Sequence, residues 1–541
     1  MTNRVRIPQG CTCCVILALT GWLSACGTQT NSPDISQTSP AASSAPIPPT
    51  PPPGSPSENA SHPTASGGAK TERPAETGQH RPAQEPFIAT TRPLNPLNSG
   101  NNSADAEIAA ARSGSPAEPV FRPSDSRARH DDKRLNALGI RAYESKRLKL
   151  YTDIDPAIAQ GLPALLDQAY LALVDYFGPL PPNREGTIFQ LTGYIMADQE
   201  RFRRAGLLPE DLPYFGHGRH RGAEFWMNDQ PTDYYRRHLM IHEATHCFML
   251  IMSGASAPIW YLEGMAELFA THQTDPNGKT HFRVMPPHKE DFAGLGRIEI
   301  IQNDVRTGRL RSPNEIARLR PNDFANNSAY AWSWALCHFL DAHPRHRQRF
   351  RELASHLTRR QFRRNFRKSF NAELSSLWTE WPLFAAGLEH GYDLERAVID
   401  FRPGEPIVAA AQPTTLEIAT DRGWQSSGIL VEQGEPYQIT ATGRYTLADK
   451  PKPWISEPQG VSIFYSGGYP IGMLLAAVRS GDPAGGGDQE SMLKLIPVGP
   501  KQQLTARATG TLYFRVNDFW SDLANNTGTV HVAVQKLAAS P

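Results

Sequence analysis

The chain is poor in cysteine, has no surplus of charge of either sign, and opens with an apolar run that is short. Of its six cysteines only Cys247 and Cys337 lie beyond residue 26, which excludes a small fold held by a disulfide framework. The 55 basic and 54 acidic residues leave a formal net charge of +1, so there is no general attraction to nucleic acid. The apolar run, residues 11–23, is too short to span a bilayer as a stable helix.

The amino terminus has instead the composition of an export signal. Arg4 and Arg6 precede the apolar run, and the run ends in Leu-Ser-Ala-Cys-Gly at residues 23–27. That ending resembles the bacterial lipobox, which implies cleavage after residue 25 and acylation of Cys26. The alternative is an ordinary signal peptide followed by a stray cysteine. We therefore predict a signal peptide over residues 1–25 and an exported protein held on the cell envelope by lipid, in the periplasm or at the cell surface.

Residues 26–132 are low in aliphatic and aromatic residues and rich in Pro, Ser, Ala, Thr, Gly and Asn. Such a segment cannot bury enough apolar surface to fold, so we predict a disordered linker. The remainder is long enough for two or three domains with their own cores. Its pattern changes near residue 413, and we predict a catalytic domain over 133–405 and an all-β domain over 413–541.

A candidate zinc site begins with His-Glu-Ala-Thr-His at residues 242–246. On a helix, His242 and His246 lie on one face and can bind one metal ion, with Glu243 beside that face as a general base. Glu263 follows in a second apolar helical pattern and is the predicted third ligand. Glu267, four residues further on, is expected to accept a hydrogen bond from a ligand histidine and orient it. The alternative is a helix with incidental polar residues.

These motifs resemble a known family. His-Glu-Ala-Thr-His, the run Trp-Tyr-Leu-Glu-Gly-Met-Ala-Glu at 260–267 and the run that starts at Tyr330 are similar to the gluzincin metallopeptidases, and most similar to their peptidase MA-like branch. The resemblance covers roughly residues 148–357. It implies an α+β zincin fold, bound Zn²⁺ and hydrolysis of a peptide or protein substrate. It also implies that Tyr330 stabilises the oxyanion, although a core aromatic side chain is an equal alternative.

Several nearby residues carry their own predictions. Residues 222–228 alternate like an edge strand, where a substrate backbone would pair. His238, four residues before His242, is expected to cap the helical stripe or to face solvent. Cys247 and Cys337 are predicted to be buried free thiols, with a disulfide between them as the alternative. The arginine-rich segment 345–368 is predicted to be a solvated helix face, with contact to membrane headgroups or an acidic substrate as the alternative.

The carboxy-terminal region has the pattern of an antiparallel β-sandwich. Short stretches of alternating polarity are separated by glycine-rich turns. They span residues 428–431, 437–445, 461–465, 473–478, 510–516 and 529–534.

The last turn of this region, residues 517–528, is rich in oxygen donors of the kind that Ca²⁺ prefers. Together with Trp-Gln-Ser-Ser-Gly-Ile at 424–429 and Ile-Pro-Val at 496–498, it resembles the calcium-dependent galactose-binding bacterial lectins. The resemblance implies Ca²⁺ ligands at Asp518, Asp522, Asn525 and Asn526, with a main-chain oxygen near Leu447. The lectins' His-Pro-x-x-Gln sugar loop has no counterpart between residues 460 and 472. An Asx-rich hairpin turn is the alternative.

Taken together, the sequence predicts a lipid-anchored zinc peptidase with a domain resembling a carbohydrate-binding module. Its expected partners are a peptide or protein substrate, a membrane reached through the anchor, and a glycan or glycoprotein, but not nucleic acid. Two alternatives stay open. One is a surface protein that binds a glycan or protein and keeps the zincin domain as a scaffold; the other is a zinc hydrolase of non-peptide amides or esters.

Overall fold

A computed structural model of the chain describes residues 120–123, 127–251, 257–291, 296–357, 359–409, 412–480 and 490–538. The described residues belong to one compact unit, Arg81–Pro541. The predicted signal peptide, Cys26 and the linker as far as residue 119 lie outside the described residues. Residues 120–123 and 127–131, which the sequence places in the linker, contact the fold. Arg122 is buried and donates to the carbonyl of Thr187 in the loop before β3 (Leu191–Met196), and His130 hydrogen-bonds to Tyr194 of β3.

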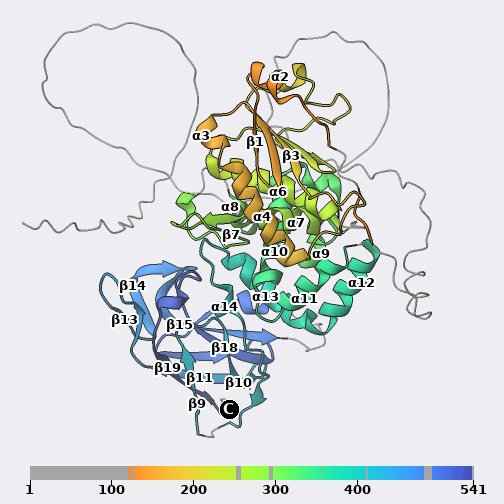
Figure 1. The fold of residues 1–541 in the computed structure, drawn as a ribbon. Helices are drawn as coiled ribbons and strands as arrows, with labels where there is room; N and C mark the ends of the chain where they lie inside the picture. The colour runs from red at the N-terminus through yellow and green to blue at the C-terminus, as the bar shows by residue number, and fades with distance from the viewer. Residues whose placement is uncertain are drawn as a thin grey trace, which may run out of the picture. The chain divides into compact units, whose positions relative to one another are not determined.

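The first half of the unit contains a five-stranded mixed sheet (Figure 1). Its order is β1 (Arg141–Glu144), β2 (Leu148–Thr152), β3 (Leu191–Met196), β5 (Glu224–Asn228) and β4 (Gly218–Arg221). β2, β3 and β5 are parallel, and β1 and β4 are antiparallel to their neighbours. Every residue of β3 is buried, as expected of a parallel strand covered on both faces.

The strand predicted at the edge of this sheet is instead next to the edge strand. β5, which occupies most of residues 222–228, lies between β3 and β4 and is buried. The edge is β4, the strand before it. Alternating polarity signalled a strand but did not reveal that the preceding residues would pair along its open side.

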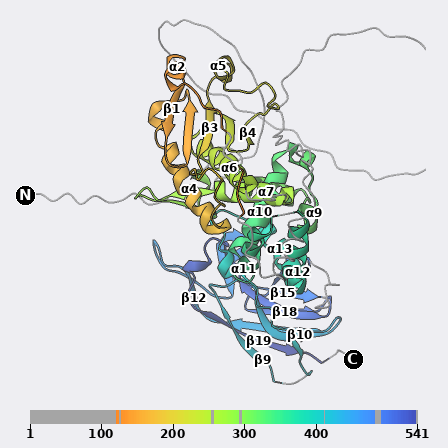
Figure 2. The same cartoon turned by 45° about the vertical axis from the view of Figure 1, so that its right-hand side comes forward.

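Helices form the rest of this half (Figures 1 and 2). The central ones are α4 (Leu162–Phe177), α6 (Asp233–Ile251), α7 (Ile259–Ala270) and α10 (Asn327–Ala342), which share one apolar core with the sheet. The others are α2 (Asp132–Ala137), α3 (Pro156–Ala159), α5 (Gln199–Arg204), α8 (Arg297–Arg306), α9 (Pro313–Ile316), α11 (Arg347–Glu352), α12 (Arg359–Phe370), α13 (Leu374–Gly387) and α14 (Leu394–Ala397), with a hairpin of β6 (His272–Thr274) and β7 (Thr280–Phe282).

Among the described residues, one segment is apolar and long enough to cross a membrane by length and composition alone, Pro156–Phe177. It comprises α3 and α4. Leu166, Leu173 and Phe177 of α4 are buried in the core shared with the sheet. Packing within the fold therefore accounts for the apolar face of this helix.

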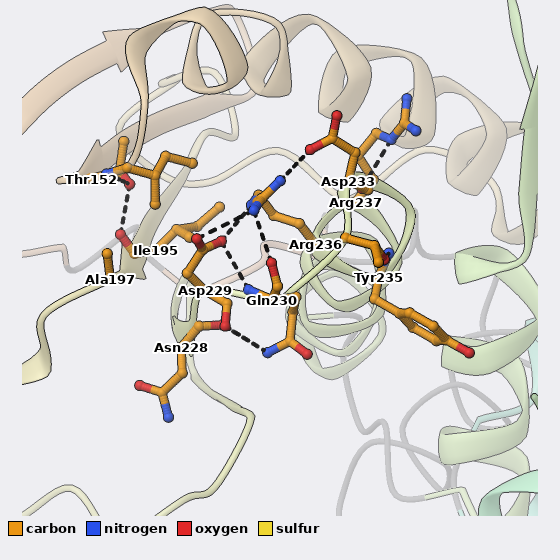
Figure 3. Close-up of polar contacts among 12 residues, drawn as sticks. Thr152, Ile195, Ala197, Asn228, Asp229, Gln230, Asp233, Tyr235, Arg236 and Arg237 are labelled. Atoms are coloured by element: carbon orange, nitrogen blue, oxygen red, sulfur yellow. Dashed lines mark hydrogen bonds and ion pairs between the residues drawn. The ribbon is translucent and has the colours of Figure 1, made fainter. Parts of the chain in front are cut away.

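The start of α6 is tied to the end of β5 by Arg236 (Figure 3). Its guanidinium donates to the carboxylates of Asp229 and Asp233 and, at 2.8 Å, to the carbonyl of Gln230. Arg236 is buried, and a bidentate contact with a carboxylate fixes orientation as well as distance. The contact therefore sets the position of α6 relative to the sheet.

Replacing Arg236 by methionine is expected to lower the free energy of unfolding by about 2–3 kcal/mol, because Asp229 loses its counter-charge while remaining only partly exposed. Denaturant unfolding followed by circular dichroism measures this. Arg237→Met is the matched control, since Arg237 donates only to the carbonyl of Asp233 in an exposed bond. Equal stability of the two variants would contradict the anchoring role of Arg236.

A buried histidine on α10 links stability to pH. His338 stacks on Trp334 with ring centroids 5.5 Å apart, and burial lowers its pKa from 6.5 to about 4. The folded state thus favours the neutral ring. Its contribution to stability is complete above the unfolded pKa of 6.5 and is lost as the pH falls from there through the folded pKa of about 4. Between pH 7 and pH 4 the wild type should lose about 3 kcal/mol more than His338→Met. Parallel unfolding curves at the two pH values measure the difference, and equal losses would contradict it.

The arginine-rich segment forms α11 and α12. Phe362 and Phe370 of α12 are buried, while Arg360, Arg363 and Arg367 are exposed. The predicted solvated helix face is confirmed.

The carboxy-terminal region is β-rich and contains two sheets around one core. One has the order β14 (Gln459–Ser466), β15 (Tyr469–Ser480), β18 (Gly510–Val516), β10 (Gln425–Val431) and β8 (Glu405–Pro406), with β16 (Ile496–Pro497) on β15. The other has the order β17 (Lys501–Thr505), β11 (Pro436–Thr442), β19 (Thr529–Lys536) and β9 (Thr414–Ala419). A short pair, β12 (Tyr445–Ala448) and β13 (Trp454–Ser456), stands apart. Five of the six predicted stretches lie within single strands, and residues 437–445 run from β11 into the start of β12. The predicted β-rich region is confirmed.

Polar and aromatic contacts join the two regions. Trp520 stacks on Tyr392 with centroids 5.4 Å apart, and the Ser521 amide donates to Glu389 at 2.9 Å. Arg479 donates to the hydroxyl of Ser375 at 2.8 Å. The described part of the chain therefore packs together at this junction.

Candidate metal centre

The two histidines of the motif and Glu263 converge inside the protein. His242 and His246 lie one turn apart on α6, and Glu263 approaches them from α7. The two Nε2 atoms are 3.1 Å apart. Oε2 of Glu263 lies 3.4 Å from Nε2 of His242 and 3.2 Å from Nε2 of His246. Ligand atoms at about 2.0–2.1 Å from a tetrahedral Zn²⁺ lie about 3.4 Å from one another. These buried groups therefore fit a small divalent metal ion.

Close helix packing brings α7 to this position. Gly264, next to Glu263, faces α10 so closely that a Cβ there would come within 2.5 Å of the Ser333 carbonyl oxygen. Any side chain would push the helices apart, and Glu263 with them. The same contact holds the beginning of α10, and thus Tyr330, near the centre.

Glu267 lies behind the triad. One of its carboxylate oxygens is 3.3 Å from Nδ1 of His242, whose Nε2 faces the triad. Arg297 of α8 binds the same carboxylate through two nitrogens, at 2.7 and 2.9 Å. The geometry is that of a carboxylate that fixes the tautomer and orientation of a ligand histidine.

His238 also contacts Glu267, with its Nε2 3.1 Å from Oε2. The expectation that it caps the helix or faces solvent is wrong, because α6 continues past it and it lies mostly buried beside Glu267. It is not among the residues that converge on the triad.

Nearby charges shift the pKa values of His242 and His246 in opposite directions. Burial opposes protonation of both. At His242 the carboxylates of Glu263 and Glu267 outweigh burial and raise the pKa to about 10. At His246 burial prevails, aided by the charge of His220, and the pKa is lowered. For Glu263, burial is outweighed by the two histidines, which lower its pKa to about 2. The site is thus strongly polarised and contains an ionised carboxylate.

Glu243 lies next to the triad but outside it. Its Oε2 is 3.0 Å from Nδ1 of His220 on β4, and the ring of His220 stacks on His246 with centroids 4.5 Å apart. Burial would raise the pKa of Glu243, but the hydrogen bond and charge of His220 and the charges of His242 and His246 lower it. A side chain on Gly218 would collide with the carboxylate, since a Cβ there would lie 2.5 Å from Oε1. Glu243 is therefore an ionised carboxylate that contacts the edge strand β4.

His220 is a site residue that sequence reasoning missed. It lies 22 residues before His242 in a run without metal-ligand spacing, and no local pattern marks it. Its place follows from the pairing of β4 with β5, which turns it toward α6.

Tyr330, at the start of α10, is fully buried beside the triad. Its ring centroid is 6.2 Å from that of His242, and the Arg297 guanidinium lies 5.6 Å from the phenol ring. Burial and then the charges of Glu263 and Glu267 raise the pKa of Tyr330, so the hydroxyl stays protonated. Tyr330 thus lies near the triad with its phenol protonated.

The loop predicted to bind calcium folds back on itself. Asp518 and Asn526 are buried, and Asp522 and Asn525 are exposed. Burial, and to a smaller extent the charge of Asp522, raise the pKa of Asp518 to about 6. In the described part of the chain Oδ1 of Asn526 is buried without a hydrogen-bond partner.

The main chain beside Leu447 borders this loop, because Thr446 exchanges two hydrogen bonds with Thr527, at 2.9 and 3.0 Å. Two carboxylates and an orphaned amide oxygen in this loop are ligand types that a hard cation prefers.

Cys247 and Cys337 are both buried and free, as predicted, and burial raises the pKa of each thiol well above its usual range. Neither belongs to the triad.

Comparison with known proteins gives little further guidance. No protein-family model matches the chain, and no curated protein matches its sequence. Among solved structures, an EclA N-terminal domain described as a PllA-like lectin is similar to part of it, with 21% identity over 23% of this chain and 94% of that chain and a TM-score of 0.18. A likeness with this TM-score carries no argument about fold or function.

Proposed function

We propose that the chain is a zinc-dependent peptidase with a gluzincin-like catalytic domain. The observation that carries the proposal is the position of Glu243, an ionised carboxylate beside the His242, His246 and Glu263 triad but not part of it. A metal site that only stabilises a fold has no use for such a base. Imidazole and carboxylate ligands together suit Zn²⁺.

A bound zinc ion would act as a Lewis acid and lower the pKa of a water molecule. His242, His246 and Glu263 would hold it, and Glu267 with Arg297 would keep His242 in the required tautomer. Glu243 accepts the proton of the attacking water and then passes it to the leaving nitrogen. Tyr330 donates a hydrogen bond to the oxygen that becomes negatively charged.

The edge strand favours a peptide substrate. In the described part of the sheet, β4 pairs with β5 alone, so its other side offers unpaired backbone groups. An extended peptide can add to such an edge as a further strand. Gly218 and His220 of β4 both contact Glu243, so a peptide on this edge would pass the base and the metal ligands.

The test combines metal analysis with a peptide assay on the full-length chain. We expect bound zinc and cleavage of a mixed peptide library, loss of cleavage with a chelator, and recovery on adding Zn²⁺. Zinc without cleavage of any peptide would reject the peptidase, leaving a scaffold or a hydrolase of non-peptide amides or esters. A chain that binds no zinc would reject the proposal at its first step.

A second candidate function belongs to the carboxy-terminal region. The orphaned Oδ1 of Asn526 and the raised pKa of Asp518 support calcium binding, and the sequence resemblance to lectins supports a glycan or glycoprotein as partner. The full-length chain should bind Ca²⁺ by calorimetry and retain glycans on an array only with calcium, and Asp518→Asn should lose both. If the chain binds Ca²⁺ but no glycan on the array, the calcium site stands and the glycan partner is rejected.

We also propose that the protein is exported and held on the envelope through lipid on Cys26. The support is the lipobox-like sequence. Cys26→Ser should shift the protein from the membrane fraction to the soluble fraction, and an unchanged distribution would reject the anchor.

A further inference from the structure

A second group of metal-binding side chains lies far along the chain from the first. His343 follows α10, His346 precedes α11, and Glu380 lies on α13. All three are buried, with exposed fractions of 0%, 0% and 5%. Their nitrogen and oxygen atoms lie within 4.8 Å of one another. Two imidazoles and one carboxylate are the same donor set as in the first centre.

Glu380 is where this group converges. Its Oε2 lies 3.2 Å from Nε2 of His343, 4.0 Å from Nε2 of His346 and 2.6 Å from the Arg345 guanidinium. Within the described residues, none of these contacts has the geometry of a hydrogen bond, and Oε2 is left without a partner of that kind. The other oxygen accepts a bond from the Ile399 amide at 2.9 Å. Oε2 is therefore held in place but is not satisfied by hydrogen bonds.

His346 is the most exceptional member. Neither ring nitrogen has a hydrogen-bond partner among the described residues, although the ring is completely buried. Buried polar atoms of this kind are rarely left unsatisfied, because desolvating them is costly. The ring stacks on His343 with centroids 4.3 Å apart, so its nitrogens lie beside the carboxylate.

Arg345 is the competing partner of Glu380. A buried ion pair between them would explain the carboxylate but not the two orphaned nitrogens of His346. Arg345 also has other contacts: it donates to the carbonyl of Ile399 at 2.8 Å and lies over the Phe401 ring at 4.9 Å. It can therefore keep its place without the carboxylate.

We propose that His343, His346 and Glu380 form a second, structural zinc site. The ligand separations of 3.2 and 4.0 Å bracket the value of about 3.4 Å expected around a tetrahedral ion. If Nε2 of His343 binds the ion, the proton of the ring lies on Nδ1. The backbone amide of Arg345, which donates to Nδ1 at 3.1 Å in this structure, then loses that hydrogen-bond acceptor. A small cavity lined by His343, Glu380 and Tyr392 adjoins these side chains.

The site would join three parts of the fold. It links the end of α10, the start of α11 and α13, and through the Glu380 bond to Ile399 it reaches the segment that leads into the β-rich region. Phe339 and Phe370 pack against His346 at centroid distances of 6.2 and 5.8 Å. Apolar rings around the ligands suit an ion that supports the fold rather than one that meets a substrate.

The test counts zinc ions in the full-length chain by elemental analysis. We expect two per wild-type chain, one in His242→Gln with His246→Gln, one in His343→Gln with His346→Gln, and none when all four are replaced. The decisive chain is the first double variant, because the second cluster is intact there and the first centre is disabled. If it is folded by circular dichroism but binds no added Zn²⁺, the second site is rejected. Zinc retained by the fourfold variant would be adventitious and would reject it as well.

Arg345→Gln in the same double-variant background gives an independent readout. Removing the cation beside Glu380 should tighten zinc binding by about tenfold or more, measured by competition with a chelating dye. Unchanged or weaker binding would show that Glu380 is not a ligand. Neither measurement uses catalytic activity, so failure of the peptidase proposal would remain distinguishable from failure of this one.

Discussion

Replacing Glu243 by glutamine is expected to lower kcat/KM for peptide cleavage by about 10²–10⁴-fold, which is the usual contribution of a positioned general base. Bound zinc should stay at the wild-type level, because the Glu243 carboxylate lies beside the triad and is not one of its ligand groups. The amide keeps the size of the side chain and can still accept a hydrogen bond from His220, but it cannot take a proton from water. Steady-state kinetics with a fluorogenic peptide, combined with metal analysis, measure both quantities.

Glu224→Gln is the matched control for this experiment. Glu224 is also a buried glutamate near α6, but it bonds to the hydroxyl of Tyr194 at 2.9 Å and has no contact with the triad. It should retain activity within about twofold, as expected for a group that makes no contact with the reacting atoms. Full activity in Glu243→Gln would remove the base from the mechanism and favour a purely structural centre.

Replacing Tyr330 by phenylalanine is expected to reduce kcat by about 10²–10³-fold, the usual effect of losing one oxyanion donor. KM and zinc content should change little, because the donor acts on charge that develops in the transition state. The raised pKa of Tyr330 keeps the phenol protonated over the whole working range, so the loss should be equal at neutral and alkaline pH.

Tyr261→Phe tests whether any buried tyrosine near these helices has the same effect. Tyr261 lies on α7 but packs against Phe350 and Phe362, away from the triad. Its variant should keep the wild-type kcat. If Tyr330→Phe also keeps it, Tyr330 is a core aromatic side chain and the oxyanion donor lies elsewhere.

Site prediction from the sequence succeeded where chemistry depends on local spacing. His242 and His246 meet because four residues make about one helical turn. Glu263 and Glu267 lie on one face of the next helix for the same reason. The strands of the sandwich followed from their period of two, which holds wherever one face of a sheet is buried. These patterns lie within single elements and need no knowledge of packing.

Predictions failed where the answer depended on which elements meet. Residues 224–228 of the predicted edge strand form β5, but its place inside the sheet was decided by the pairing of β4. His238 was judged from its position on one helix, whereas the Glu267 carboxylate that it contacts comes from another. Arg297, which binds the same carboxylate, lies 30 residues beyond Glu267, with no spacing that would reveal it.

The sequence by itself determined the metal-binding motif and the division into a mixed helical region and a β-rich region, and it favoured two buried free thiols over a disulfide. Only the tertiary structure decided which strand forms the edge, that His220 contacts Glu243, and that His343 and His346 meet Glu380. The physical reason is the range of the interactions. Helical and strand periodicity are properties of neighbouring residues, whereas a contact between distant residues exists only after their elements have packed into one core.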